Sequence, residues 1–185
     1  MTAGGDLLLH VCCGPCMTVV HRELVREGFG VTGYFCNPNI HPWKERERRL
    51  AALTDYTEEK GIPLEVENDY PLEENLRMLL AAENRCSACF HDRLSATARK
   101  ASEMGMENFS TTLSVSPYQN QELIGRAGAR AEEEWGVRFV FRDFRDGYRE
   151  SISLSREAGM YRQSYCGCVF SERDRYLKIK SPGQP

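Results

Sequence analysis

The sequence lacks the features of a membrane-spanning, exported or nucleic-acid-coating protein. No apolar run approaches the roughly 18 residues that a transmembrane helix needs. The stretch before Asp6 carries no basic region, and the apolar stretch Leu7–Leu9 that follows is too short for a signal peptide. The formal net charge is −3, so the chain has no general positive field with which to coat nucleic acid. We therefore expect a cytosolic protein without membrane association, in a compartment that keeps thiols reduced.

Several enzyme motifs are also missing. The chain shows no Ser–His–Asp arrangement and no P-loop for nucleotide phosphates. It does contain 41% hydrophobic residues in 185 positions, enough for one domain with a full core. Arginine supplies 19 of the 24 basic residues, and its planar fork suits phosphate contacts. A local surface for RNA therefore stays open, beside the alternative that these arginines pair with the 27 acidic residues.

Apolar periodicity predicts strands that alternate with helices from residue 6 to residue 141. The expected strands are 6–11, 31–35, 64–66, 109–115 and 137–141, and the expected helices are 17–26, 43–60, 119–135 and a region 72–104 broken near 84–87. This alternation is typical of βαβ units, so we expect one α/β domain over residues 1–185, ending in a polar tail at about 179–185. Its sheet should be largely parallel, with helices on both faces. Ligands bind at the carboxyl ends of such strands, where Cys12, Cys13, Cys36 and the segment Ser114–Pro117 are expected to meet.

Cysteine is the residue type that most demands an explanation. Seven of the eight cysteines fall in three clusters, Cys12-Cys13-Gly-Pro-Cys16, Cys86-Ser-Ala-Cys89 and Cys166-Gly-Cys168, while Cys36 stands alone and is expected in the core. A disulfide framework would suit a small secreted chain, which this is not. A structural zinc site needs four ligands, and seven clustered thiols exceed that number. The sequence therefore predicts an iron–sulfur cluster with four sulfur ligands, plus further thiols for redox chemistry or metal binding.

Charged and imidazole side chains lie near these clusters. A helix that starts near Cys16 would place its positive dipole end beside the first cluster and favour thiolates. Arg85 and Arg93 lie near the second cluster and are expected to offset negative charge there. Of the histidines, we expect His21 on the surface and His41 exposed in a loop, because Asn and Pro surround His41.

Seven motifs, in this order and with this content, resemble the QueH-type epoxyqueuosine reductases. They are His10–Cys16, Tyr34–Pro42, Arg85–Phe90, Arg93-Leu94, Phe109–Leu113, Ser116–Gln119 and Tyr161–Ser171. The resemblance covers nearly the whole chain. It implies a Rossmann-like fold similar to that of ATP-pyrophosphatase-type tRNA modifiers, with a cysteine-rich C-terminal segment. The Ser-Gly-Gly nucleotide loop of that superfamily is absent, and Cys12–Pro15 follows the first strand instead.

The resemblance also implies a reaction and a site. These enzymes reduce epoxyqueuosine to queuosine at the wobble position of tRNA, the last step of queuosine synthesis, by two-electron removal of the epoxide oxygen. By resemblance, Cys12, Cys13, Cys86 and Cys89 are the expected ligands of a [4Fe-4S] cluster. Cys166 and Cys168 are the expected redox-active pair. Alternatively, either of them ligates an additional mononuclear iron beside the cluster, for which Cys16 is a further ligand.

The implied partners are a tRNA anticodon stem-loop and an electron donor of the ferredoxin or flavodoxin type. We expect Trp43 to stack on a base and the arginines after it to meet phosphates, although an ordinary amphipathic helix with Glu–Arg pairs is the alternative. Two other functions stay open, a zinc-binding RNA adaptor and an iron–sulfur tRNA thiolase. The full set of expected substrate or RNA contacts is His10, Asn37, Asn39, His41, Trp43, Arg46, Arg49, Ser116, Tyr118 and Gln119.

Overall fold

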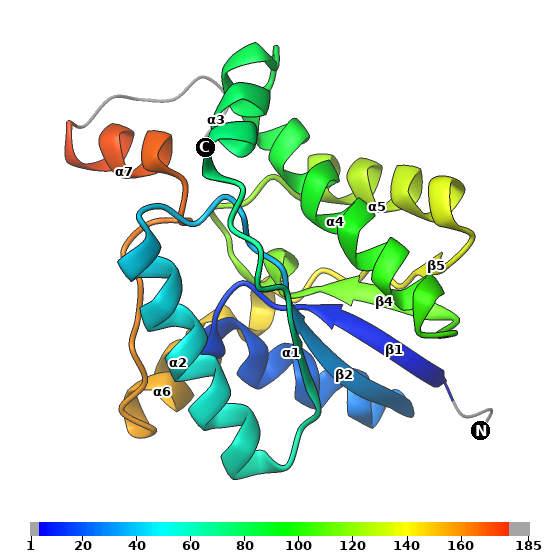
Figure 1. The fold of residues 1–185 in the computed structure, drawn as a ribbon. Coiled ribbons are helices and arrows are strands. Elements are labelled where there is room, and N and C mark those ends of the chain that lie inside the picture. The colour runs from blue at the N-terminus through cyan, green and yellow to red at the C-terminus, as the bar shows by residue number, and fades with distance from the viewer. Residues whose placement is uncertain (1–3, 178–185) are drawn as a thin grey trace.

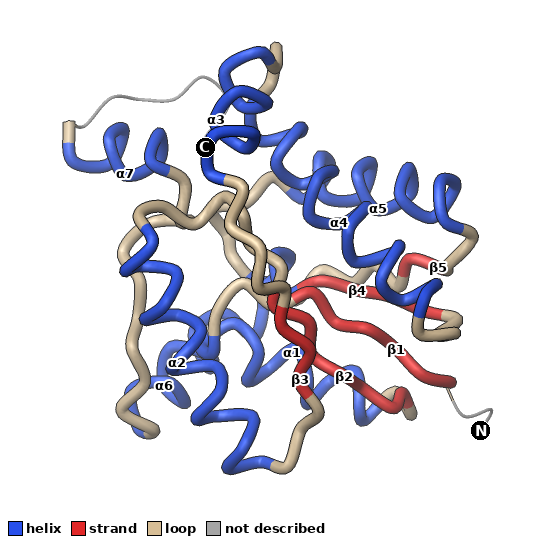
Figure 2. Tube along the Cα trace, in the orientation of Figure 1, coloured by secondary structure: helices blue, strands red, loops and turns tan. Residues whose placement is uncertain are grey.

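Parallel strands form the sheet of this protein, whose computed structural model describes residues 4–177. Within these residues the sheet has five strands in the order β3-β2-β1-β4-β5, and every neighbouring pair is parallel, as predicted (Figures 1 and 2). In the central strand, Leu8 lies opposite Thr32 of β2 and Phe109 of β4. The strands are β1 (Gly5–His10), β2 (Phe29–Phe35), β3 (Leu64–Val66), β4 (Asn108–Thr111) and β5 (Arg138–Phe139).

Helices cover both faces of the sheet, which confirms the predicted α/β class. In Figure 1 the helices α1 (Gly14–Arg26), α2 (Trp43–Lys60) and α6 (Tyr148–Glu157) lie on one side, and α4 (Arg85–Glu103) and α5 (Gln121–Trp135) lie on the other. The shorter α3 (Leu72–Ala81) and α7 (Val169–Tyr176) lie toward the carboxyl edge of the sheet.

Three consecutive leucines in β1 explain why this strand is central. Leu7, Leu8 and Leu9 have no solvent exposure, since alternate side chains of a strand point to opposite faces. Leu8 packs in the core beneath α4 and α5, whereas Leu7 and Leu9 pack in the core beneath α1 and α2. Full burial of each such side chain stabilises the fold by about 1.5–3 kcal/mol.

The observed elements depart from the prediction mainly in the second half of the chain. The strand expected at 109–115 ends at Thr111, whose hydroxyl accepts a hydrogen bond from the Leu113 amide and starts a 3-10 turn, Thr112–Val115. β5 covers only two residues of the expected 137–141. The break expected near 84–87 separates α3 from α4, and the side chain of Asn84 caps α4.

From Asp143 onward the sequence pattern is mixed and predicts no regular element. The structure has a 3-10 turn, Arg145–Gly147, followed by α6, an irregular segment at 158–168, and α7. The polar tail predicted at about 179–185 lies outside the described residues. In the part that the structure describes, each helix is too short or too polar to cross a membrane.

Candidate metal and redox site

The junction of β1 and α1 gathers the first three cysteines, hereafter the cysteine triad. Helix α1 begins at Gly14, earlier than predicted, so Cys13 is its N-cap residue and Cys16 lies one turn along it. The Sγ atoms of Cys13 and Cys16 are 2.8 Å apart, and those of Cys12 and Cys13 are 3.7 Å apart. All three sulfurs lie within 4.8 Å of one another, which makes the triad a site suited to a metal or an iron–sulfur cluster.

The surroundings of the triad favour a thiolate at Cys12. Hydrogen bonds from the thiols of Cys13 and Cys16 hold the pKa of Cys12 well below its ordinary value, and Thr112 also contacts its sulfur at 3.5 Å. Burial instead raises the pKa of Cys13. The triad adjoins the N-terminus of α1, whose first turn carries no acidic residue, so the helix dipole adds a positive field beside the sulfurs.

The second cluster lies at the start of α4, and a buried arginine lies one turn further along the same helix. Cys86 is exposed, whereas Cys89 is buried, and burial raises the pKa of Cys89 to about 12. Arg93 is only 3% exposed, and its Nε donates to the Cys89 carbonyl at 3.2 Å. Burial acts to lower the pKa of Arg93, but the negative charge that the sulfurs of Cys89, Cys12 and Cys166 carry as thiolates acts to raise it, and the pKa is raised overall. Arg93, expected beside the second cluster, thus lies where its charge also acts on cysteines of the first and third clusters.

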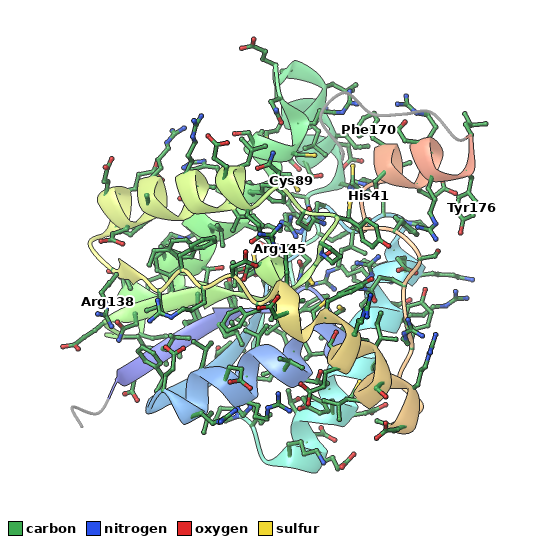
Figure 3. All side chains as sticks on the ribbon, turned by 180° about the vertical axis from the view of Figure 1, so that it is seen from behind. His41, Cys89, Arg138, Arg145, Phe170 and Tyr176 are labelled. Carbon is green, nitrogen blue, oxygen red and sulfur yellow. The ribbon has the colours of Figure 1, made fainter. Side chains whose placement is uncertain are left out.

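The third cluster reaches the first through the irregular segment before α7. Gln163 donates from Nε2 to the Cys13 sulfur at 2.9 Å, across 150 residues of sequence. Cys166 is exposed, and its thiol donates to the Ser171 hydroxyl at 2.9 Å. Figure 3 shows Cys89 of α4, His41 and Phe170 of α7 in the same region. Sequence reasoning gave no role to Gln163 or Thr112, although both lie inside the quoted motifs, because neither is a usual ligand.

The eight cysteines, all within the described residues, are free thiols, so no disulfide joins Cys166 to Cys168 here. Cys36 is buried in the core, as predicted. The carboxyl ends of β1, β2 and β4 do meet at one edge: the Cys12 amide donates to Thr112 after β4, and Asn37 after β2 donates to the Val11 carbonyl. The structure therefore groups Cys16 with Cys12 and Cys13 more tightly than the predicted division of the thiols implied.

Three residues that were expected to be exposed or to contact RNA are buried. His41 was expected to be exposed, but it is 5% exposed because the segment before α7 covers it, and the Val169 amide donates to its Nδ1. Arg46 and Arg49 were expected to meet RNA phosphates, but they are 3% and 1% exposed. Arg46 lies over the Trp43 ring and donates to the Glu67 carbonyl, so its guanidinium is engaged within the protein.

The other predicted contacts divide into buried and exposed residues. His10 is fully buried, shares a hydrogen bond with the Thr111 hydroxyl, and has a pKa lowered to about 4 by burial and by Arg93. Asn37 and Asn39 are buried as well. Trp43 and Tyr118 are exposed, and Ser116 and Gln119 are partly exposed. His21, expected on the surface, is partly buried.

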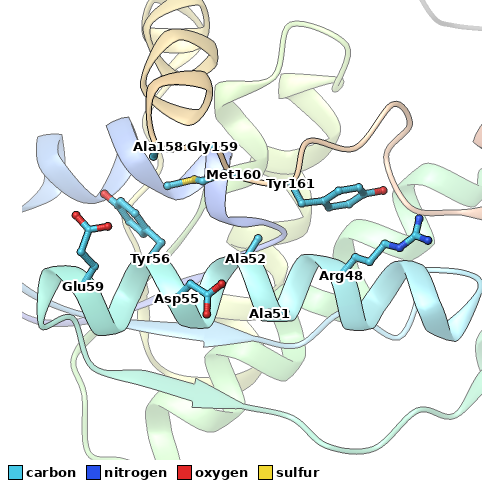
Figure 4. A pocket seen from close by; sticks show the side chains of 10 residues that line it. All are labelled: Arg48, Ala51, Ala52, Asp55, Tyr56, Glu59, Ala158, Gly159, Met160 and Tyr161. Carbon is cyan, nitrogen blue, oxygen red and sulfur yellow. The ribbon is translucent and has the colours of Figure 1, made fainter.

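A surface groove of about 490 Å³ lies between α2 and residues 158–161 (Figure 4). It is lined by three charged residues, by the larger side chains of Tyr56, Met160 and Tyr161, and by alanine and glycine. The charged residues are Arg48, Asp55 and Glu59, and no cysteine is among the lining residues. In Figure 4 the Arg48 side chain extends toward the Tyr161 ring, with its guanidinium carbon 5.9 Å from the ring centre. The cysteine site is therefore separate from this groove.

Comparison with known proteins shows the family of this chain. A sequence model described as epoxyqueuosine reductase QueH matches residues 7–174, a range that includes all eight cysteines. The chain belongs to the epoxyqueuosine reductase QueH family. The QueH protein of Dehalococcoides mccartyi is 40% identical over 178 residues, covering 95% of this chain and 97% of that relative. The QueH protein of Thermotoga maritima is 38% identical over 186 residues, with 94% of each chain covered.

A solved structure resembles this QueH family member in fold. The U34-tRNA thiolase NcsA from Methanococcus maripaludis, solved with its [4Fe-4S] cluster, has a TM-score of 0.58 to this chain. The match covers 97% of this chain and 67% of the thiolase at 16% sequence identity, so it speaks for the fold alone. The predicted likeness of fold to tRNA-modifying enzymes is confirmed.

Proposed function

We infer that this protein is an epoxyqueuosine reductase that converts epoxyqueuosine to queuosine in tRNA. The observation that carries the inference is the QueH family match over residues 7–174, which spans every element that holds a cysteine cluster. The relatives from Dehalococcoides mccartyi and Thermotoga maritima, which carry that description, align over 97% and 94% of their own length. The reaction removes the epoxide oxygen as water and leaves an alkene, which consumes two electrons and two protons.

For the cofactor we propose a [4Fe-4S] cluster held by Cys12, Cys13, Cys86 and Cys89. Four thiolates are the usual ligand set of such a cluster. The proximity of the Cys12 and Cys13 sulfurs and the position of Arg93 between the N-terminal sulfurs and Cys89 support this set. A bound cluster would supply electrons one at a time, while Arg93 would offset its negative charge.

The remaining thiols are proposed to supply the second redox unit that a two-electron reduction needs. Cys166 and Cys168 either cycle between dithiol and disulfide or, with Cys16, hold an additional iron. The 2.8 Å separation of the Cys16 and Cys13 sulfurs supports a place for Cys16 beside the cluster. The exposure of Cys166 supports access to substrate and to an external electron donor of the ferredoxin or flavodoxin type.

For the anticodon stem-loop we propose contacts at the exposed aromatic residues Trp43 and Tyr118, with Ser116 and Gln119 beside the latter. Bases of single-stranded RNA stack on such side chains, and each stack contributes about 1–3 kcal/mol. Trp43→Ala should therefore weaken stem-loop binding by about tenfold. Trp135→Ala is the matched control, because Trp135 is similarly exposed but lies at the end of α5. Equal affinities for both variants would remove Trp43 from the interface.

The family match favours reduction over the two other functions considered. A zinc-binding RNA adaptor leaves three of the seven clustered thiols without use. An iron–sulfur thiolase shares the fold, but it needs a nucleotide loop that the segment Cys12–Pro15 does not provide. Iron and zinc analysis of protein purified without oxygen tests the first alternative, which predicts zinc in place of iron. A requirement for ATP in turnover tests the second, which predicts that activity depends on ATP.

The deciding experiment follows the nucleoside itself. tRNA that carries epoxyqueuosine is incubated with the reconstituted enzyme and a low-potential reductant, and its nucleosides are analysed by mass spectrometry. We expect loss of one oxygen, 16 mass units by the stoichiometry above, only when enzyme and reductant are both present. Sulfur incorporation, or no change of mass with fully loaded enzyme, would contradict the proposed function.

A further inference from the structure

The Cys166–Cys168 segment has no regular secondary structure of its own. It lies between the end of α6 at Glu157 and the start of α7 at Val169, where helix or sheet hydrogen bonds do not fix the backbone. A segment of this kind keeps its position through other parts of the chain that bind its backbone groups. The residue that does most of this binding comes from α2, more than 100 residues earlier in the chain.

That residue is Arg49, and each of its guanidinium nitrogens has a partner. Nη1 donates to the Cys166 carbonyl at 2.9 Å, and Nη2 donates to the Tyr165 carbonyl at 3.0 Å. Nε donates to the Glu45 carboxylate at 2.8 Å, one helical turn away on the same helix. Arg49 is 1% exposed, so these bonds form where water does not compete for them.

Glu45 extends the contact to a second point on the same segment. Its other carboxylate oxygen accepts a hydrogen bond from the Tyr161 hydroxyl at 2.5 Å. The residue is 6% exposed and supplies the counter-charge that a buried guanidinium needs. The Glu45–Arg49 pair therefore binds the segment at Tyr161, Tyr165 and Cys166. These contacts cover the residues that lead into the Cys-Gly-Cys turn.

The backbone of His41 also binds the Cys-Gly-Cys turn. The His41 amide donates to the Gly167 carbonyl at 2.8 Å, and the Tyr165 hydroxyl donates to the His41 carbonyl at 2.5 Å. Gly167 has φ +123°, and a Cβ there would lie 2.9 Å from Ile40 and 3.3 Å from the Arg49 Nη1. A glycine at this position is what lets the turn lie directly on Arg49.

Arg49 also faces the cysteine triad. Its Nη1 donates to the Cys166 carbonyl, and the Cys13 sulfur is among the groups that act electrostatically on its guanidinium. Gln163 makes the parallel contact, from the same segment to the Cys13 sulfur. One buried cation thus borders both groups of sulfurs.

We propose that the Glu45–Arg49 pair is a positioning device that holds Cys166 and Cys168 in register with the cysteine triad for the redox step. The inference rests on the proposed function, in which the two C-terminal cysteines act in turnover. Arg49 itself touches no reacting atom in this assignment. It acts through the backbone of the residues it holds.

The choice of arginine makes the proposal testable with a conservative change. Lysine keeps the charge, but its single nitrogen cannot bind two adjacent carbonyls and a carboxylate in one plane. Arg49→Lys should therefore keep the buried ion pair and release at least one carbonyl. Arg49→Met removes the charge as well and leaves Glu45 unpaired. The matched control is Arg126, which pairs with Glu122 at the same i,i+4 spacing on α5 but is 74% exposed.

The experiment measures the reactivity of individual cysteines in the reconstituted enzyme. Alkylation by N-ethylmaleimide is followed at Cys166, Cys168 and Cys86 by peptide mass spectrometry, together with amide exchange over residues 161–168. In Arg49→Lys we expect alkylation of Cys166 and Cys168 to rise about fivefold, with faster exchange over 161–168 and no change at Cys86. Arg126→Lys and Arg126→Met should match the wild type.

Turnover kinetics supply the second measurement. If the register of the sulfurs matters, Arg49→Lys should lower kcat about tenfold and leave KM within about twofold, at unchanged iron content. Tyr161→Phe, which removes only one contact of Glu45, should give a smaller change of the same kind.

Three outcomes would overturn the proposal. Wild-type alkylation and exchange in Arg49→Lys would show that Arg49 does not hold the segment. A uniform rise at every cysteine would show a general loss of stability instead. A local rise with unchanged kcat would make the pair a structural contact without a part in turnover. Failure of the proposed function is distinct, since an absence of epoxyqueuosine reduction by the fully loaded wild-type enzyme would leave the alkylation and exchange results standing.

Discussion

The cysteine triad and the Cys166–Cys168 pair are held in place by different means. The triad lies where a strand with fully buried leucines passes directly into a helix, so the sheet and α1 fix the sulfurs. The pair lies in an irregular segment whose position depends on Arg49, Glu45, Gln163 and the loop at Ile40–His41. The core therefore holds the cysteine triad, the candidate metal-binding group, and individual polar contacts place the second group against it.

The difference is useful for redox chemistry. A metal site benefits from ligands that do not move, because preorganised ligands lower the cost of binding. A thiol pair that exchanges electrons with a substrate and an external donor must stay accessible. The exposed Cys166 and the buried Cys12 and Cys13 fit this division.

Substitution of single cysteines should give the largest effects, and the quantity that changes should differ between the two groups of cysteines. Cys13→Ser, Cys86→Ser and Cys89→Ser should each lower bound iron and sulfide by about tenfold, because each removes a proposed cluster ligand. Cys166→Ser and Cys168→Ser should keep the cluster spectrum and lose most reduction of epoxyqueuosine. Iron, sulfide and absorbance measurements after anaerobic reconstitution test both statements.

Cys36→Ser is the control for these cysteine variants, since Cys36 is buried but belongs to no cluster. Loss of iron beyond the four atoms of the cluster in Cys166→Ser would favour the second-iron role, whereas unchanged iron would favour the dithiol role. Loss of the whole cluster in either C-terminal variant would move that cysteine into the ligand set.

A second prediction concerns Arg93, which borders both groups. Arg93→Met removes the buried cation, so thiolates at Cys89 and Cys12 lose a favourable partner and metal affinity should fall about tenfold. The loss should shrink as pH rises, because thiols ionise without the cation at higher pH. Cobalt(II) titration followed by its thiolate absorption measures the affinity. Arg99→Met is the control on the same helix, 50% exposed, and an equal loss there would contradict the assignment.

A third prediction acts on the backbone under the pair. Gly167→Ala places a Cβ against Ile40 and Arg49 at positive φ, which should cost about 1–3 kcal/mol. We expect the cost to appear as faster amide exchange over residues 161–168, with the exchange of β1 unchanged. Gly159→Ala is the control, because Gly159 also has positive φ (+62°) but nothing lies within 4 Å of its added Cβ. Equal effects of the two variants would mean that the contact with Arg49 and Ile40 contributes little.

The smallest predicted effect concerns the hydroxyl beside Cys166. Ser171→Ala removes the acceptor of the Cys166 thiol, 2.9 Å away, and one donor to the Cys168 carbonyl. The alkylation rate of Cys166 should change by about twofold to threefold, while iron binding by the triad stays constant. Ser164→Ala, which removes a hydroxyl that contacts Tyr176 instead, should leave the rate as it is. A change in iron content with Ser171→Ala would show that the two groups are less independent than described.

The parts of the fold that sequence predicted well are those with strong local signals. The apolar run Leu7–Leu9 and the break at Gly14-Pro15 predicted β1 and the position of the first cysteine cluster. The charged repeat after Trp43 predicted the bounds of α2. α6 and α7 escaped prediction because they are short and polar, with few buried residues. β5 was overestimated because Val140 and Phe141 are as apolar as a strand requires, although pairing stops at Phe139.

The sequence by itself determined the chemistry of this protein: seven clustered thiols in a Rossmann-like chain, with enough local periodicity to place two clusters at helix starts. Tertiary structure alone decided which thiols meet and which charges accompany them. Arg46, Arg49 and His41 look like surface residues in sequence, because arginine and loop histidine are usually solvated. Arg49 and His41 are buried because residues 161–169, which fold back over α2 and the loop at His41, supply the carbonyls and amides that replace water. Arg46 is buried against the Trp43 ring and the Glu67 carbonyl instead. Contacts across more than 100 residues leave no local pattern, so only the folded chain reveals them.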